Sequence, residues 1–449
     1  MTLRKHTGTL CRQAGWILLA TGICVPSNLS SSEESNLTLE RVLALPAHAV
    51  PLWKVYLEKS QKRMAADKEF FEKEMAAKGV KESFLPPKGR AFGTGDVNVS
   101  SDRWVSGPEA SRIADIVVSF QIPSGGWCKG VDMTQHIRRP GERFCSDKGW
   151  RYVGTFDNNT TIAQMRFLAR AFLATGNETY KRAFLKGLEY VFMAQYPNGG
   201  WPQVYPLMTG YHDNITFNDG AMTNVMDLLR EIAAGKAGFE FVSPEKRRRA
   251  RVAFERGIGC ILDCQVIADG KQTAWGQQHD PLTLKPAKAR AYEMVSLSAA
   301  ESARVMVELM EVETPSPRVK EAVQAAAAWF RNTAIYGHVW KKDSDGDMKL
   351  LPAEGAEPIW ARYYQIGTNR PLFSDKDSIV RYDVKEITPE RRRAYGWYSI
   401  NGRDALKKYE EWRTRHGIAS RPARSASQTA LRSGQFGQLE SRAIFALEI

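Results

Sequence analysis

Two short acidic stretches of this 449-residue sequence carry side chains that could bind a cation. One is Asp157-Asn-Asn-Thr-Thr161 and the other is Asn218-Asp219. Carboxylate and amide oxygens suit Ca²⁺, which accepts six to eight oxygen ligands in flexible geometry. The same residue types also cap helix N-termini, where their oxygens accept backbone N–H groups. Asp157 and Asp219 are therefore candidate metal ligands, with plain capping as the alternative.

Two arginines accompany acids in the second half of the chain. Arg290 precedes Glu293 by three residues, and Arg362 lies in the stretch Ile359-Trp-Ala-Arg-Tyr-Tyr364. A guanidinium beside a carboxylate commonly forms an ion pair, but its planar fork also matches the carboxylate of an anionic sugar. Four aromatic residues near these motifs could stack on sugar rings or belong to the core: Trp201, Tyr205, Tyr211 and Tyr292.

A Gly-Gly-Trp phrase recurs along the chain and organises these motifs. Gln121 to Trp127 and Gln195 to Trp201 are nearly the same phrase, and Trp275 follows Trp201 by the same 74 residues that separate the first two tryptophans. A fixed internal period indicates a repeat architecture. We expect a fainter fourth copy to end at Trp340.

Each copy has a helix-like segment on either side of the turn. The preceding segments are Ala110 to Phe120, Tyr180 to Ala194, Val252 to Cys264 and Val319 to Thr333. The following helices are expected to begin near Asp157, Asp219 and Glu293, the last two 18 residues after their tryptophans. The pattern predicts an all-α toroid of paired helices, with a loop-rich mouth where the acids converge.

The two ends of the chain differ from the repeats. Residues 1–27 have a basic start and an apolar run too short to span a membrane, which predicts a signal peptide and a secreted protein, extracellular or periplasmic. Residues 28–105 are expected to form a linker and an outer helix over 57–79. The catalytic toroid would occupy 106–416, and residues 417–449 would form a disordered tail. We expect no stable membrane insertion.

The charge of the chain favours an anionic partner. The formal net charge is +13, of which about +8 lies outside the two ends. Long-range attraction of this sign suits nucleic acid or an acidic polysaccharide, although it also fits a merely soluble basic protein.

Four cysteines remain if the signal peptide is removed. Cys128 and Cys145 could pair across their loop in an oxidising compartment. Cys260 and Cys264 lie one helical turn apart and are expected to be buried thiols, because no further ligand stands at zinc-binding spacing.

Five phrases together resemble polysaccharide lyase family 10, the pectate lyases, in collinear order from Ser106 to His416. They are Thr155-Phe-Asp-Asn-Asn-Thr-Thr161, Pro197-Asn-Gly-Gly-Trp-Pro-Gln203, Tyr211-His-Asp-Asn-Ile-Thr-Phe-Asn-Asp219, Ala289-Arg-Ala-Tyr-Glu293 and Trp360-Ala-Arg-Tyr-Tyr364. The resemblance implies an (α/α)3 barrel. It also implies cleavage of polygalacturonate (pectate) by calcium-assisted β-elimination, which gives unsaturated oligogalacturonides.

The resemblance also implies roles for single residues. Arg290 would take the C5 proton of the substrate, and Asp157 and Asp219 would lie at the Ca²⁺ and the substrate carboxylate. The implied substrate-binding residues are Arg362, Lys376, Asn158 and Lys129. Because the reference pKa of arginine exceeds 12, nearby cations and an alkaline optimum are expected.

Two positions depart from the family pattern. Lys376 stands where the family usually has arginine, which turns a bidentate grip on a carboxylate into a point charge. Gly220 stands where a second aspartate commonly follows Asp219. The first change predicts either weaker binding of the substrate or a different preferred uronate, and the second leaves the affinity for Ca²⁺ open.

Two other functions remain open from the residues alone. One is a glycoside hydrolase on an α/α toroid that uses two of Asp157, Asp219 and Glu293 as general acid and base. The other is a non-catalytic binder of acidic glycans. We expect a monomer whose partner is polygalacturonate or a related acidic polysaccharide and not nucleic acid.

Overall fold

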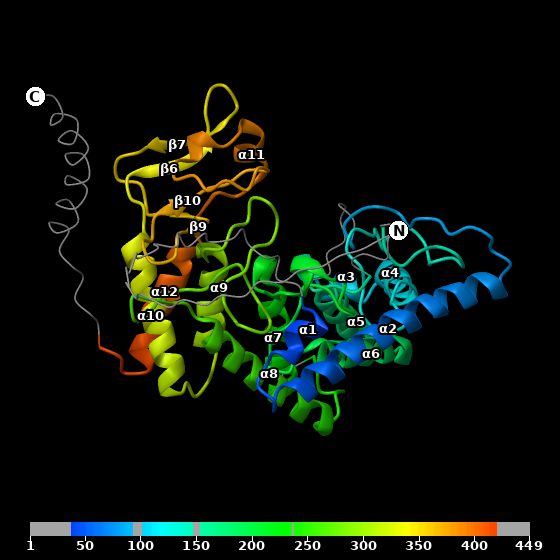
Figure 1. The fold of residues 1–449 in the computed structure, drawn as a ribbon. Helices are drawn as coiled ribbons and strands as arrows, with labels where there is room; N and C mark the ends of the chain where they lie inside the picture. Colours follow the sequence, from blue (N-terminus) through cyan, green and yellow to red (C-terminus); the bar gives the residue numbers. More distant parts are fainter. Residues whose placement is uncertain (1–36, 93–100, 147–152, 236–237, 420–449) are drawn as a thin grey trace, which may run out of the picture. The chain divides into compact units, whose positions relative to one another are not determined.

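The computed structural model describes residues 37–92, 101–146, 153–235 and 238–419 (Figure 1). The chain divides into two compact units, residues 1–33 and 34–449, and every described residue belongs to the second. The expected signal peptide and most of the expected disordered tail lie outside the described residues. These two expectations therefore stay predictions.

Helices dominate the described part of the chain. They are α1 (Leu39–Leu43), α2 (Val50–Ala77), α3 (Asp102–Val105), α4 (Pro108–Ser119), α5 (Ile162–Thr175), α6 (Glu178–Ala194), α7 (Ala221–Ala234), α8 (Pro244–Cys264), α9 (Ala299–Met310), α10 (Pro317–Thr333), α11 (Pro389–Ala394) and α12 (Asn401–Arg415). Local sequence explains several ends: Ser243 and Ser316 cap helices that start with proline, and Gly176 and Gly235 end α5 and α7 in the left-handed conformation.

The long helices alternate between two sets. Helices α5, α7, α9 and α12 contact one another in succession, while α4, α6, α8 and α10 each precede one of them in the chain. Consecutive helices also pack across the two sets, as α5 does on α6 and α7 on α8. The all-α class of paired helices is therefore confirmed, and all four expected helices that precede the turns are present.

The Gly/Trp turn joins one repeat to the next through repeated hydrogen bonds. The amides of Gln121, Gln195 and Gln265 each donate to a carbonyl of the following outer helix, at 2.8 to 3.0 Å. The indole N–H of Trp127 and that of Trp201 each donate to the preceding outer helix. These bonds give the glutamine amides and the indole N–H groups of fully buried tryptophans hydrogen-bond acceptors, and they connect each turn to the neighbouring outer helices.

The fourth copy of the turn is centred on Trp360 and not on Trp340, so the expectation from sequence was wrong. The Trp360 indole donates to Phe330 O in α10 and is fully buried, as in the other copies. Trp340 is only half-buried and lies in a hairpin, β6 (His338–Lys342) paired with β7 (Met348–Pro352). This hairpin is inserted between α10 and the turn.

The loops carry short strands and single 3₁₀ turns. The remaining strands are β1 (Ile215–Thr216), β2 (Ile267–Ala268), β3 (Lys271–Gln272), β4 (Gln278–His279), β5 (Leu297–Ser298), β8 (Trp360–Ala361), β9 (Tyr363–Tyr364), β10 (Pro371–Leu372) and β11 (Tyr398–Ser399). All their pairings are antiparallel: β1 with β4, β2 with β3, β8 with β11, and β9 between β5 and β10. They fix the loops that form the expected mouth.

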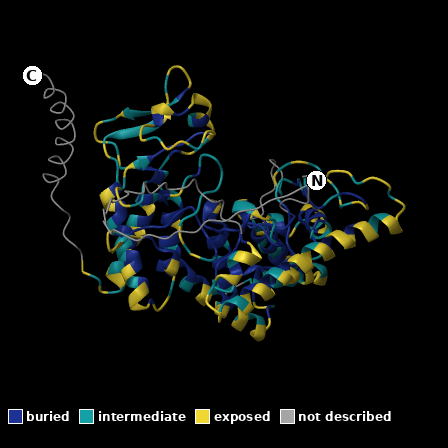
Figure 2. Cartoon of the chain, viewed as in Figure 1, coloured by how far each residue is buried: buried dark blue, intermediate teal, exposed yellow. Residues whose placement is uncertain are grey.

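Helix α2 extends the expected outer helix by seven residues at its start. Figure 2 shows it as mostly exposed, with a narrow buried side. From that side the Asp67 carboxylate accepts two hydrogen bonds from Ser124 in the first Gly/Trp turn, and the Tyr56 hydroxyl donates to Ala194 O before the second. The helix therefore fastens two successive repeats.

Candidate active site

Two 3₁₀ turns bring the acidic stretches together. They are η1 (Asp157–Asn159), before α5, and η3 (Asn218–Gly220), before α7, and the two turns contact each other. Each turn has a non-glycine residue in the left-handed region, Asn158 at φ 51° and Asp219 at φ 50°. Asn and Asp tolerate this conformation best, which explains their presence here.

A pocket of about 100 Å³ lies where these turns meet the loop before α9. Ten residues line it: Lys129, Asp157, Asn158, Gln203, Tyr211, Asn218, Asp219, Gln278, Arg290 and Glu293. Five of the seven residues expected at the site are among them. The repeat pattern predicted that Asp157, Asp219 and Glu293 converge, and all three line this pocket. Arg290, which the family resemblance adds, lines it as well.

The Asp157 carboxylate is only half satisfied. One oxygen, Oδ2, is paired with the Lys129 ammonium, while Oδ1 is buried without a hydrogen-bond partner. Burial and the negative charges of Asp157 and Glu301 raise the pKa of Asp219, although Arg362 and Arg290 oppose them. At Asp219, burial and the neighbouring carboxylates therefore outweigh the two arginines.

This donor set fits Ca²⁺. The orphaned Asp157 oxygen, the Asp219 carboxylate and the nearby Asn158 amide are the hard oxygen ligands the ion prefers. In the described part of the chain, no three His, Cys, Asp or Glu side chains are placed to hold a metal. A cation held here would need oxygens from its ligand as well as from the protein.

Arg290 is held by Glu293 in the same loop. The Arg290 guanidinium donates to Glu293 Oε1, and its backbone N–H donates to Oε2 at 3.1 Å. Burial alone would lower the pKa of Arg290, but the hydrogen bond and charge of Glu293 outweigh it and raise that pKa above its ordinary value. In this arrangement the Glu293 carboxylate keeps Arg290 protonated, and the cations that would lower its pKa stay a prediction.

Glu293 is also fixed from a distant part of the chain. The Tyr395 hydroxyl donates to Glu293 Oε1 at 2.7 Å and shares a hydrogen bond with the Tyr363 hydroxyl, also at 2.7 Å. The Tyr395 ring lies under two guanidinium groups, 4.5 Å from that of Arg362 and 5.6 Å from that of Arg290. Tyr395 therefore connects the two arginines.

Arg362 lies behind the pocket wall and not on it. Its guanidinium donates to Asn218 Oδ1 at 3.2 Å and to Glu301 Oε1 at 3.0 Å, and its side chain is 15% exposed. Burial lowers the pKa of Arg362, but Glu301 and Tyr363 more than offset this effect. The residue supplies a fixed positive charge one side chain away from Asp219.

Lys376 is not brought into the pocket. Its ammonium pairs with Glu390 at 3.1 Å, and 66% of its side chain is exposed. The family motif in the sequence places this residue near the site, but motif order does not fix the direction of a flexible side chain. Lys288 connects the loop that carries Arg290 with the loop that carries Lys376, because its ammonium donates to Ser378, two residues beyond Lys376.

The aromatic candidates divide between core and site. Trp201 and Tyr205 are buried, whereas Tyr211 lines the pocket and Tyr292 is partly exposed beside Arg290. Sequence reasoning did not single out three residues that structure places at or around the site: Gln203, Gln278 and Tyr395. Gln203 ends one of the family phrases, which was the available signal for it.

The helix that follows Glu293 begins later than expected. Helix α9 starts at Ala299, six residues after Glu293, and Glu301 stands in its first turn. Glu293 instead belongs to the preceding loop, where Glu293 N donates to Arg290 O at 2.8 Å. The expected helix start at Glu293 was wrong, but the acid still reaches the pocket.

The fold and the pocket together define an all-α protein in which two carboxylates, Asp157 and Asp219, could bind a cation and the guanidinium groups of Arg290 and Arg362 are held in place. This arrangement suits an anionic, oxygen-rich ligand. The sequence model of the pectic acid lyase family matches residues 121–406. This chain therefore belongs to the pectic acid lyase family and is a lyase. No curated protein sequence gives a match.

Two solved structures are similar to the chain over most of its length. One is a family 10 polysaccharide lyase from Cellvibrio cellulosa, with 33% sequence identity and a TM-score of 0.61, covering 71% of this chain and 98% of that one. The other is a mutant of that lyase in complex with trigalacturonic acid, with 32% identity, the same TM-score, and coverage of 70% and 98%. Both support the α/α toroid class.

Among the described residues, no helix has the length and apolar character needed to cross a membrane.

Proposed function

We propose that the protein is a pectate lyase that cleaves polygalacturonate by β-elimination with the help of Ca²⁺. The observation that carries the proposal is the convergence of Asp157, Asp219 and Arg290 on one pocket in a chain of this family. The complex of the related lyase with trigalacturonic acid supports an acidic polysaccharide as the substrate.

The reaction needs a base and stabilisation of negative charge. The C5 proton of a galacturonate unit lies next to a carboxylate, whose charge opposes the developing carbanion. Ca²⁺ bound by Asp157 and Asp219 would supply a Lewis acid at that carboxylate. In our proposal Lys129 and Asn158 bind the substrate at the pocket wall, and the buried charge of Arg362 stabilises it from behind.

Arg290 is the proposed base, and its ion pair with Glu293 controls whether the guanidinium can lose its proton. While the Arg290–Glu293 pair is intact, the guanidinium keeps its proton. Removing that proton requires the pair to loosen and cations to approach, because a neighbouring positive charge lowers the pKa of a guanidinium. Activity should accordingly rise as the pH rises above neutral.

Two of the three candidate acids, Glu293 and Asp157, do not favour hydrolysis by a general acid and base. Burial raises the pKa of Glu293, but its hydrogen bonds with Arg290 and Tyr395 have the larger combined effect, so the pKa lies below its ordinary value. Such a group is a poor proton donor. Asp157 is paired with Lys129.

The substrate also accounts for the proposed cellular location. Pectate is a plant polysaccharide that an enzyme meets outside the cell, and residues 1–27 have the pattern of a signal peptide. We propose a secreted enzyme that acts as a monomer. Size-exclusion chromatography with light scattering would measure the oligomeric state.

The test is the chemistry of the product. Purified protein is incubated with polygalacturonate and Ca²⁺, and both ultraviolet absorbance and reducing ends are measured. Elimination creates a conjugated double bond, so absorbance and reducing ends should rise together. Reducing ends without absorbance would indicate a hydrolase, and binding with neither change would indicate a glycan-binding protein.

A further inference from the structure

Two buried thiols lie against each other at the edge of the active-site pocket. Cys128 and Cys145 are 1% and 2% exposed, and burial together with the adjacent Cys145 thiol raises the pKa of Cys128. The chain segments that carry them run side by side, because a Cβ atom on Gly130 would lie 2.7 Å from Ser146 Oγ. The contact between the thiols therefore reflects the path of the backbone as well as the side chains.

Cys128 begins the segment that forms one wall of the pocket. Its thiol donates to Lys129 O at 3.1 Å, and the Lys129 ammonium pairs with the proposed calcium ligand Asp157. Any restraint on Cys128 therefore acts one residue away from a proposed substrate-binding group.

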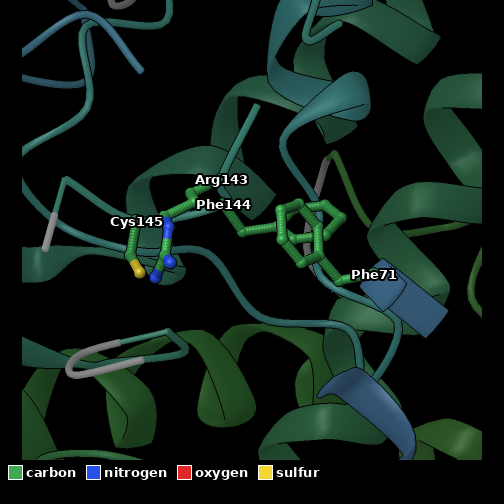
Figure 3. Close-up of a pocket in the computed structure, with 4 residues that line it drawn as sticks. All are labelled: Phe71, Arg143, Phe144 and Cys145. Carbon is green, nitrogen blue, oxygen red and sulfur yellow. The ribbon is translucent and has the colours of Figure 1, made fainter. Parts of the chain in front are cut away.

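Cys145 lies on a segment that is fastened to helix α2. Figure 3 shows Phe144 beside Phe71 of that helix, while the Cys145 side chain points away from both rings. Arg138, earlier in the same loop, forms a bidentate ion pair with Glu74 of α2, and its guanidinium lies 3.8 Å from the Phe144 ring centroid. The Cys145 side of the pair thus has a rigid support.

The second thiol pair in the described chain offers a contrast. Cys260 and Cys264 are also buried and adjacent, but both stand on α8, one turn apart. Side chains at this spacing leave a helix in nearly the same direction, and a disulfide requires Cβ atoms about 3.5 to 4.5 Å apart. This pair cannot be joined without unwinding the helix, so it serves as an internal control.

We propose that Cys128 and Cys145 form a disulfide in an oxidising environment and that this bond fixes the Lys129 wall of the pocket to the scaffold of α2. A small-molecule disulfide such as oxidised glutathione is the oxidant. One S–S bond forms as both thiols lose their protons, and the two electrons reduce the oxidant to two thiols. The bond closes a loop of 16 intervening residues, which restricts the unfolded chain.

The first test is chemical. The proposed mature protein, which lacks residues 1–27 and with them Cys11 and Cys24, is refolded with oxidised and reduced glutathione, unfolded, alkylated without reductant and digested for mass spectrometry. The expected result is one cross-linked peptide pair, Cys128 with Cys145, while Cys260 and Cys264 are both alkylated. Alkylation of Cys128 and Cys145 in the oxidised sample would overturn the proposal.

The second test measures the effect on the site. The Cys128→Ser/Cys145→Ser variant should melt about 5 °C below the oxidised parent, which is the expected size for a loop of this length. The KM for polygalacturonate should rise several-fold with a smaller change in kcat, because Lys129 is held less firmly. The Cys260→Ser variant should keep the KM of the parent.

Reduction provides a second measurement that does not depend on how well a variant folds. Dithiothreitol should lower the melting temperature of the parent and raise its KM to the values of the double variant, and it should leave the double variant unchanged. Equal effects of dithiothreitol on both proteins would contradict the role assigned to this bond.

Discussion

Replacing Glu293 by glutamine tests how the pocket controls the proposed base. The substitution keeps the size of the side chain and removes the negative charge that pairs with Arg290. A hydrogen bond to a charged group contributes about 1.5 to 3 kcal/mol. Because 41% of the Arg290 side chain is exposed, we use the lower end of that range.

That free energy corresponds to a measurable change in proton affinity. About 1.4 kcal/mol equals one pKa unit, so Glu293→Gln should lower the pKa of Arg290 by about one unit. Below that pKa the deprotonated fraction increases about tenfold. The rising limb of kcat against pH should therefore move down by about one unit, even if looser positioning of Arg290 lowers the plateau.

The assay follows unsaturated product from saturating polygalacturonate across a pH series, for the parent, Glu293→Gln and a control. The matched control is Glu301→Gln, which removes a buried carboxylate from Arg362 and not from Arg290. The control should leave the rising limb of kcat in place. If the Glu293→Gln profile coincides with that of the parent, the reasoning that Glu293 keeps the base protonated is refuted.

Three further predictions concern the metal, the turns and the stability of the fold. Lys129→Gln should tighten Ca²⁺ binding measured by calorimetry, because the competing ammonium on Asp157 is removed, and should raise the KM; unchanged Ca²⁺ affinity would contradict the proposed competition. Gly199→Ala should lower the free energy of unfolding by about 2 kcal/mol or more in denaturant titrations, since the φ of Gly199 is 95° and the added Cβ would collide with Arg256 O. The control is Gly259→Ala in α8, where the added Cβ meets nothing within 4 Å, so this substitution should not be destabilising. Burial and Asp227 raise the pKa of Glu308 to about 9 against the opposing charge of Arg230. The free energy of unfolding of the parent should therefore fall as the pH rises from about 4.5 to 9, by up to about 1.4 kcal/mol per pH unit. Glu308→Gln should show a flatter dependence on pH, and parallel curves for the two proteins would refute the assignment.

The repeat explains why much of the fold was predictable. The Gly-Gly-Trp phrase specifies a buried turn, since Gly125 at φ 114° leaves no room for a Cβ beside Lys186 O. Hydrophobic periodicity before each turn then locates the outer helices. The fourth copy failed because the inserted hairpin supplies its own tryptophan, Trp340, at nearly the expected place. Its burial and its indole hydrogen bond to Phe330 O distinguish Trp360 from Trp340.

The site was predictable to the extent that it depends on local motifs. Asp157 and Asp219 follow from the helix starts, but the contact of Tyr395 with Glu293 joins residues 102 positions apart, and nothing in the local sequence indicates it. The pairing of Lys376 with Glu390 is equally invisible to a motif. Side-chain direction and long-range hydrogen bonds are set by packing, which one sequence does not display.

The most direct test of the central claim is the initial rate of unsaturated product formation from polygalacturonate, measured for the parent and Asp219→Ala with Ca²⁺ and with a chelator. We expect a rate for the parent that the chelator abolishes and added Ca²⁺ restores. We also expect the variant to lose at least about two orders of magnitude in rate, because charge stabilisation in the transition state is removed. A parent rate that is indifferent to the chelator, or an Asp219→Ala variant of full activity, would contradict the account.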